Sequence, residues 1–397
     1  MTIYVDGKRR LREIVAVFLR LGIIGFGGPL AHIGLMEDEC VTRRQWLTRE
    51  TFLEGLALCN LFPGPTSTQL TIYLGYMRAG LVGGVLSGTC FIFPAFLFVL
   101  VLAWAYMQYG TLPAIGALFV GIGPVVVAII INTLFRSGKT ALTTLSSWCI
   151  AGGACLLTLI PLLPPAINLL TILLVAGVIG MVLYGRAPPD VPASTTKSSQ
   201  KSIAFVPFVE AKALLYYIAP GLPLLISLAL VFLKIGFLMF GGGLVIAPLL
   251  QQELVDGHHW LTTKQLLDGL ALGQLTPGPV TVVATFAGYA VAGFAGGVIA
   301  TIAIFLPSFV LVLGFSPLVV RVRDIPLAKG FLKGITAGSL GAIAAAAIFL
   351  GRTAIVDWLT AAIALLCVVL LLRWNVNTLF LIAGAAIIGL LRMFLLG

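Results

Sequence analysis

Two equivalent segments of the chain carry polar residues that could bind a small anion. Thr66-Ser67-Thr68-Gln69 follows Pro63-Gly64-Pro65 directly, whereas Pro277-Gly278-Pro279 precedes a segment with the single hydroxyl of Thr281. Proline suits the start of a helix, where unpaired N–H groups and the helix dipole attract negative charge. The first segment therefore predicts an anion site and the second a weaker one. The alternative is that both Pro-Gly-Pro sequences merely shape packed re-entrant loops.

Charged side chains inside apolar segments form a second group of candidates. Arg20 and Lys234 occupy equivalent positions, as do Glu54 and Asp268, each carboxylate being followed by Gly-Leu-Ala-Leu. A charge at such depth is costly and usually faces a partner or a water-filled path. One interpretation assigns the anion to the cations and a coupling proton to the carboxylates. The other pairs Arg20 with Glu54 and Lys234 with Asp268, or lets the cations extend to the membrane surface.

Further candidates flank these segments. Glu39 and Glu253 are equivalent, precede a Trp-Leu-Thr sequence, and are expected in loops near the membrane surface as coupling or ion-pair residues. His32 is expected to be a packed side chain. We expect no metal site or cofactor, because His258-His259 alone supplies too few ligands. The remaining predicted substrate-binding residues are the backbone and amide groups of Gly27, Gly28, Asn60, Gly241, Gly242 and Gln274.

The composition excludes a soluble globular protein. Of the 397 residues, 60% are hydrophobic and 10% are charged, against about a quarter in soluble domains. Apolar runs of membrane-spanning length recur along the chain, so the predicted class is an all-α polytopic membrane protein. No basic cluster suits nucleic acid. The absence of HExxH, GxSxG and Walker A motifs argues against these types of hydrolytic enzyme and against direct ATP drive.

The chain is an internal duplication. At a constant offset of 214, 22 of the 49 residues from Phe18 to Thr66 are identical to their partners, and after Pro-Gly-Pro the offset becomes 213. A match of this length marks a repeat architecture. We therefore predict a first repeat over residues 1–185, a cytoplasmic linker over 186–212 and a second repeat over 213–397.

Each repeat is expected to contain broken helices followed by four transmembrane helices. The glycine pair and proline within residues 13–36 predict a helix break. Residues 51–79 form two arms too short to span a bilayer, so a hairpin is favoured over one discontinuous crossing. The predicted spanning runs of the first repeat are 81–107, 113–135, 141–160 and 166–184. In the second repeat, arms at 263–275 and 280–293 precede runs at 294–318, 328–350, 355–372 and 376–396.

Basic residues predict that the two repeats are inverted. The positive-inside rule places Arg136 and Arg321 in the cytoplasm and the uncharged loops at Gly110 and Pro161 outside. These assignments require opposite orientations of the two repeats. The apolar run 213–233 is expected to supply the extra crossing. The basic N-terminus is expected in the cytoplasm, which leaves open whether residues 13–36 cross the membrane.

Three motifs carry a resemblance to a known family: residues 26–32 (FGGPLAH), 41–47 (VTRRQWL) and 59–65 (CNLFPGP). Over essentially its whole length the chain resembles the chromate ion transporter family, long-chain type. The resemblance implies a bacterial inner-membrane protein that exports chromate, driven by the electrochemical gradient. The family usually has Gln at the position of Asn60 and Ala-Ser-Ser-Gln at the position of residues 66–69.

Inverted repeats with paired broken helices are typical of secondary transporters, whose sites lie between the repeats near the bilayer midplane. We therefore expect a carrier that exports chromate first and related tetrahedral oxyanions such as sulfate second. An exporter of another small anion or organic acid, and a passive anion channel, are the alternatives. The expected partners are the oxyanion, the lipid bilayer and a coupling proton or counter-anion. A homodimer stays open, and nucleic acid is not expected.

Overall fold

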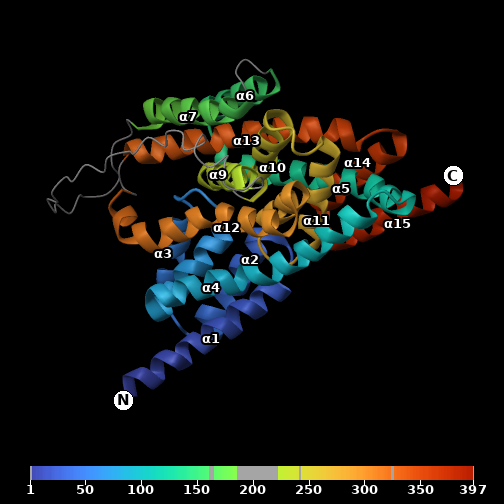
Figure 1. Ribbon diagram of the computed structural model, residues 1–397. Coiled ribbons are helices and arrows are strands. Elements are labelled where there is room, and N and C mark those ends of the chain that lie inside the picture. Colours follow the sequence, from blue (N-terminus) through green and yellow to red (C-terminus); the bar gives the residue numbers. More distant parts are fainter. Residues whose placement is uncertain (1, 161–164, 186–221, 241–242, 323–325, 397) are drawn as a thin grey trace.

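The computed structural model describes residues 2–160, 165–185, 222–240, 243–322 and 326–396, and every regular element in these ranges is helical (Figure 1). Four helices in this part are long and apolar enough to cross a membrane: α4 (Thr66–Tyr109), α5 (Pro113–Ala141), α12 (Val283–Val322) and α13 (Pro326–Ala354). The protein is therefore a multi-pass helical membrane protein, as predicted. The proposed linker 186–212, Pro161, Gly241 and Gly242 lie outside the described residues.

The two repeats contain the same series of elements. The first also has α1 (Thr2–Ile24), α2 (Gly28–Glu37), the π-helical turn η1 (Asp38–Arg43), α3 (Arg49–Cys59), α6 (Leu145–Leu159) and α7 (Pro165–Tyr184). The second also has α9 (Leu222–Leu238), the 3-10 turn η2 (Gly243–Val245), α10 (Ile246–Leu250), the π-helical turn η3 (Gln251–Gly257), α11 (Thr263–Leu275), the 3-10 turn η4 (Val280–Val282), α14 (Trp358–Trp374) and α15 (Thr378–Leu396).

The predicted helix breaks are present. Gly27 and Gly28, with φ of 104° and 80°, separate α1 from α2 in a conformation that side chains disfavour. The arms around residues 63–65 are α3 and the first part of α4. A second break, at Gly80 with φ of 65°, separates this arm from the membrane-crossing part of α4, and Gly293 with φ of 61° does the same in α12. The hairpin is thus preferred to one discontinuous crossing.

The start of the segment 13–36 and the turn that follows it both lie near the kink of α4. Near the start of this segment Glu13 forms an ion pair of 2.8 Å with Arg78, at the kink of α4. Just beyond its end Trp46 packs on Phe18, with ring centroids 6.2 Å apart, and lies 5.2 Å from the Arg78 guanidinium. Glu13 and Trp46 therefore both lie beside Arg78, an arrangement expected of a second re-entrant hairpin formed by α1 and α2.

The repeats are inverted, as the basic residues predict. The Arg136 guanidinium, near the end of α5, donates to the Leu371 carbonyl at 3.3 Å and to the Asn375 side chain. The end of α5 therefore lies beside the end of α14. Helices α13 and α14 are consecutive and antiparallel, so the end of α14 is level with the start of α13. Equivalent helices α5 and α13 thus run in opposite directions. We call the end that holds Arg136, Lys139 and Lys329 the basic end; the positive-inside rule assigns it to the cytoplasm.

The two repeats are interlocked. Helices α6 and α7 of the first repeat pack against α13 of the second, and α14 and α15 pack against α5 of the first (Figure 1). Small residues allow these contacts: a Cβ on Gly334 would meet the Ala176 carbonyl at 2.1 Å, and one on Gly121 would meet the Ala385 carbonyl at 2.0 Å. Close backbone approach at small residues is the usual means of helix association in membranes. Each repeat therefore completes its packing with helices of the other.

Part of the run 213–233, which the sequence predicts as an extra crossing, has a counterpart in the first repeat. Residues 222–233 belong to α9, which packs along α12 as α1 packs along α4. Gly236 of α9 approaches Ile304 and Pro307 as Gly22 of α1 approaches Phe91 and Pro94. Helix α9 is thus the counterpart of α1. The sequence comparison of the two repeats began at Phe18 and therefore left out the first part of α1. Residues 213–221 lie outside the described part.

We predict a specific labelling pattern for single cysteines in a cysteine-free background. Cysteines at Arg9, Lys139 and Lys329 should react with a membrane-impermeant thiol reagent from the same side, because all three lie at the basic end. A cysteine at the exposed Leu112 should react from the other side. Labelling of Arg9Cys together with Leu112Cys would contradict the re-entrant α1–α2 hairpin.

Candidate functional site

The two Pro-Gly-Pro loops are joined to the two helix breaks by a reciprocal pair of backbone hydrogen bonds. The Gly64 N–H donates to the Met239 carbonyl at 2.6 Å, and the Gly278 N–H donates to the Gly25 carbonyl at 2.7 Å. Both donors and both acceptors are related by the repeat offset of 214. The loop of each repeat therefore contacts the break of the other, on a pseudo-twofold axis between them.

These hydrogen bonds satisfy groups that the helix breaks leave unpaired. The last carbonyls of a helix lack an intrahelical partner, and such groups are costly away from water. In each loop the flanking prolines have no N–H, so glycine is the donor the loop supplies. Gly64 and Gly278 have φ of 129° and 88°, which glycine tolerates and other residues disfavour. The residue types of the loop thus follow from the contact it makes.

Unpaired polar groups gather beside the first loop. Helix α4 starts at Thr66 without a side-chain cap in the described structure, and Gln69 is the first residue whose N–H bonds back, to the Pro65 carbonyl at 3.0 Å. Ser67, Thr68 and Gln69 are buried. Within the described residues, Thr68 Oγ1 and Gln69 Oε1 are buried and have no hydrogen-bond partner.

The edge of this loop is held by its own side chains. Thr66 Oγ1 donates to Asn60 Oδ1 at 3.2 Å, and Gln69 Nε2 donates to the Pro63 carbonyl at 2.6 Å. Asn60 ends α3 and is exposed, so it links the two arms of the hairpin at their tip. The predicted residues 60–69 therefore come together around one helix start.

Ser308 of α12 completes the cluster from the other repeat. Its side chain is fully buried, and its Oγ has no hydrogen-bond partner among the described residues. A Cβ on Gly64 would lie 2.5 Å from Ser308 Oγ and 2.6 Å from Gln69 Nε2, so the hydroxyl lies directly against the loop. Sequence reasoning missed Ser308. Its repeat partner is Ala95, and a comparison of the halves at this position would have revealed the difference.

The second loop is less polar. It continues into the 3-10 turn η4 in place of an α-helix start, with Val280 and Val282 on either side of Thr281. The methyl group of Ala95 lies 3.0 Å from the Cβ position of Gly278, where the first loop has the Ser308 hydroxyl. Thr281 Oγ1 is buried without a hydrogen-bond partner in the described residues. The loops therefore share a backbone arrangement but differ in hydrogen-bonding capacity.

The ion pairs differ from both predicted pairings. Lys234 Nζ lies 2.7 Å from Glu253 Oε1, so Lys234 pairs with Glu253 and not with Asp268. Glu39 pairs with Arg44 at 2.7 Å. Both glutamates lie in π-helical turns, not in loops as predicted, and both are buried. Burial explains the pairing, since an isolated charge would be strongly disfavoured there.

The other charged candidates are separated. Arg20 and Glu54 are exposed, and no ion pair joins them in the described structure. Asp268 is 3% exposed, and its Oδ2 accepts a hydrogen bond of 2.7 Å from the Tyr106 hydroxyl of the first repeat. The two equivalent carboxylates thus have different environments, which the sequence alone did not indicate.

The remaining candidates lie around the breaks. Gly27 and Gly28 follow the carbonyl of Gly25, which also accepts a hydrogen bond of 2.9 Å from His32 Nε2. His32 is 1% exposed and packs edge-on against Phe91, as expected for a packed histidine. Gln274 is half-buried in the last turn of α11. In the described residues no three His, Cys, Asp or Glu side chains gather in a way that could hold a metal ion.

The fold and these loops define a membrane transport protein built from two inverted repeats with broken helices. The chain belongs to the chromate transporter family, whose match covers residues 12–181 and 226–390 and so includes both repeats. This is a family of transporters and not of enzymes.

Several relatives match nearly the whole chain. The chromate transport protein of Cupriavidus metallidurans is 38% identical, over 96% of this chain and 92% of the relative. A probable chromate transport protein of Synechococcus elongatus is 34% identical, over 92% and 91% of the two chains. The chromate transport protein of Pseudomonas aeruginosa is 33% identical, over 86% and 81%. No solved structure matches the chain significantly.

We predict that the Lys234–Glu253 pair stabilises the fold as a unit. Glu253→Gln leaves a cation without its carboxylate and should destabilise the protein by about 2 kcal/mol or more. The double change Lys234→Met with Glu253→Leu should recover most of that loss, because apolar residues of similar size replace both charges. Thermal unfolding of the detergent-purified protein measures this.

The control is Glu54→Gln at the exposed repeat equivalent of Asp268, which should change stability by less than about 0.5 kcal/mol. Equal effects of Glu253→Gln and Glu54→Gln, or a double variant less stable than Glu253→Gln, would show that the pair has no such role.

Proposed function

We propose that this protein is a secondary active transporter that exports chromate across a bacterial inner membrane, with the anion bound at the start of α4. The observation that carries the proposal is the set of unpaired hydrogen-bonding groups around the first loop: the N–H groups at the start of α4, Thr68 Oγ1 and Ser308 Oγ. The relatives named as chromate transport proteins support the choice of anion.

The chemistry of a tetrahedral dianion suits this set. Its four oxygens accept hydrogen bonds, and the N–H groups at the start of α4 and the hydroxyls of Thr68 and Ser308 are neutral donors carried by helices α4 and α12. A hydrogen bond to a charged partner contributes about 1.5–3 kcal/mol, so three or four of them give useful affinity without a cation. Sulfate has the same shape and charge and is the expected second substrate. Arg20 and Lys234 then have a smaller role than the sequence predicted, since Lys234 already has Glu253 as a counter-charge.

The inverted hairpins supply a route for alternating access. The α3–α4 hairpin enters from the basic end, and the α11–α12 hairpin enters from the other end. The loop of each hairpin is hydrogen-bonded to the helix break of the opposite repeat. Movement of one repeat relative to the other would open the anion site to one side and then to the other.

Asp268 is the favoured coupling residue. Its carboxylate is buried, has no ion pair in the described structure, and is hydrogen-bonded only by Tyr106 there. The charged neighbour that acts on it is Lys264, exposed one turn earlier on α11. Asp268 is therefore buried in contact with a residue of the other repeat, whereas its repeat equivalent Glu54 is exposed. Proton entry at Asp268 from the outside would accompany export of the anion.

Chromate flux in proteoliposomes tests the function. We predict saturable flux that responds to an imposed voltage and to an imposed pH gradient. Asp268→Asn should remove the response to pH while chromate exchange at zero gradient continues, and Glu54→Gln should keep both. Flux that rises linearly with concentration would favour the passive channel, and saturable flux of another anion with no chromate flux would favour the other alternative.

The comparison of the two loops tests the binding site. Ser67→Ala with Thr68→Val removes two hydroxyls beside the first loop and should raise the apparent KM for chromate on the order of tenfold or more, given about 1.5–3 kcal/mol for a hydrogen bond to an anion. Thr281→Val at the second loop should have a smaller effect. If Thr281→Val is equally harmful, or the double variant transports normally, the first loop is not the principal site.

A further inference from the structure

A concave site separate from the two Pro-Gly-Pro loops lies between α6 and α7. These helices form a layer on α13 at the edge of the bundle (Figure 1). The groove has a volume of about 480 Å³, within the usual range of roughly 300–1,000 Å³ for ligand sites. Its walls are almost entirely apolar and are formed by residues such as Cys149, Gly153 and Leu157 of α6 and Val175, Ile179 and Leu183 of α7.

The groove leads to a polar corner at the basic end, where α6 begins and α7 ends. Ser146 lines the groove, and its Oγ lies 2.9 Å from the Tyr184 hydroxyl. Thr144 Oγ1 lies 3.1 Å from each of these two oxygens. Three hydroxyls thus form a tight cluster within hydrogen-bonding distance of one another.

A cation borders this corner. Lys333 Nζ of α13 lies 4.2 Å from the centre of the Tyr184 ring. No carboxylate pairs with Lys333 in the described part of the chain. The corner therefore combines one positive charge with three hydroxyl groups at the level of the basic end, which is the membrane surface that attracts anionic lipids.

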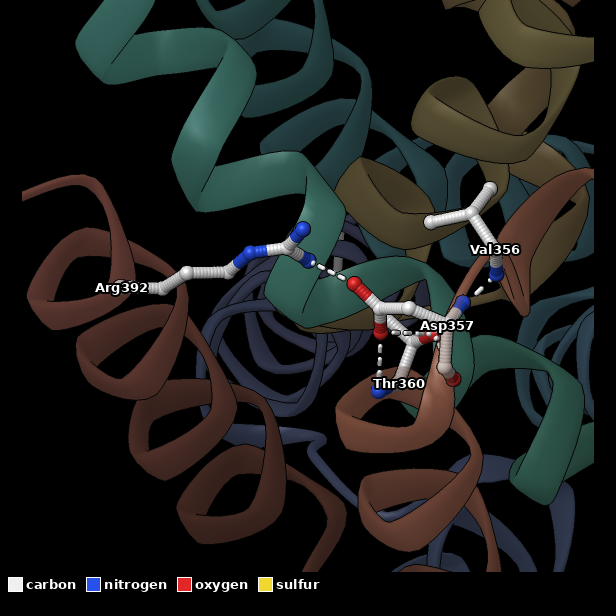
Figure 2. Close-up of polar contacts among 4 residues, drawn as sticks. All are labelled: Val356, Asp357, Thr360 and Arg392. Carbon is white, nitrogen blue, oxygen red and sulfur yellow. Dashed lines mark hydrogen bonds and ion pairs between the residues drawn. The ribbon is translucent and has the colours of Figure 1, made fainter. Parts of the chain in front are cut away.

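The equivalent corner of the second repeat shows what this one lacks. Thr144 and Asp357 cap equivalent helices at an offset of 213, and each accepts a hydrogen bond from the N–H three residues later. Asp357 also forms an ion pair of 2.6 Å with Arg392 (Figure 2). The hydrogen bonds from the Thr360 N–H and hydroxyl, with the charge of Arg392, hold the pKa of Asp357 below its usual value.

In the second repeat the cation Arg392 is thus neutralised by an acid of the same chain. In the first repeat the capping residue is a neutral threonine. The cation at this corner, Lys333, comes from α13 of the other repeat and is not the repeat equivalent of Arg392, and no carboxylate pairs with it in the described structure. A phosphate would supply the missing negative charge. The hydroxyls would donate to its oxygens, and charge-assisted hydrogen bonds of this kind are strong.

We propose that this corner binds the phosphate of an anionic phospholipid, one acyl chain of which lies in the α6–α7 groove. The combination selects a lipid over a soluble phosphate, because the apolar groove joins the polar corner directly and opens towards the hydrocarbon region. It selects an anionic lipid over a zwitterionic one, because a headgroup that carries its own cation would place that charge near Lys333.

Two pairs of matched variants of the full-length protein test the site. Lys333→Gln removes the cation of the corner, and Lys139→Gln removes an exposed cation at the same end outside it. Gly153→Leu fills the groove, whereas Gly152→Leu adds the same side chain next to it. A Cβ on either glycine meets no atom within 4 Å, so both positions have room for the start of a side chain.

Native mass spectrometry of the purified protein with phosphatidylglycerol or phosphatidylcholine of identical chains gives the readout. The unmodified protein should retain phosphatidylglycerol at least fivefold more than phosphatidylcholine. Lys333→Gln should abolish this preference, and Gly153→Leu should lower retention of phosphatidylglycerol at least fivefold. Lys139→Gln and Gly152→Leu should behave like the unmodified protein.

Three results would overturn the proposal. The first is equal retention of both lipids by the unmodified protein. The second is an effect of Gly152→Leu as large as that of Gly153→Leu. The third is a dimer that Gly153→Leu dissociates, which would assign the groove to a second copy of the chain. If Lys333→Gln does not fold, the two glycine variants still decide the outcome.

Discussion

The exchange of two backbone hydrogen bonds between the repeats is the constraint on which the rest of the structure depends. Helix breaks expose N–H and carbonyl groups, and hydrocarbon offers them no partner. Here the Gly64 N–H reaches Met239 and the Gly278 N–H reaches Gly25, so the loop of each repeat satisfies the break of the other. Each break therefore depends in part on the other repeat. The same mutual dependence recurs in the outer helices, where α7 packs on α13 and α15 packs on α5.

Duplication supplies a symmetric frame, and a few substitutions make it asymmetric. Backbone geometry is shared by the two loops, including the glycine conformations that a side chain would strain. The side chains are not shared: the first loop has Ser67, Thr68 and the facing Ser308, and the second has Thr281 and the facing Ala95. Because each loop is held by its backbone, its side chains are free to differ. One loop can therefore specialise in binding while the other maintains the symmetric contact.

Local features of the fold were predictable from the sequence. Glycine and proline act on their own backbone, so the breaks near Gly27 and Pro63 could be read directly, and the repeat revealed their counterparts. Basic residues at helix ends were sufficient to predict the inversion, which the contact of Arg136 with α14 confirms.

Contacts between distant segments were not predictable. Helix α1 is apolar on most sides beyond its basic start, so its sequence does not indicate that Arg20 is exposed. The partner of Lys234 depends on the π-helical turn that carries Glu253, whereas one of the two interpretations of the sequence paired it with Asp268. Ser308 was overlooked because a serine in an apolar helix has no local signal. Its significance comes from the Gly64 loop of the other repeat.

Equilibrium binding of chromate to purified protein carrying Ser308→Ala or Ala95→Ser tests the central claim most directly. These positions are repeat equivalents beside the two loops, so each variant alters one hydroxyl in the same structural setting. Ser308→Ala should weaken binding on the order of tenfold, because it removes a buried donor to the anion. Ala95→Ser should leave the affinity of the first loop unchanged. Unchanged binding in Ser308→Ala, or an equal loss in both variants, would contradict a one-sided anion site formed by both repeats.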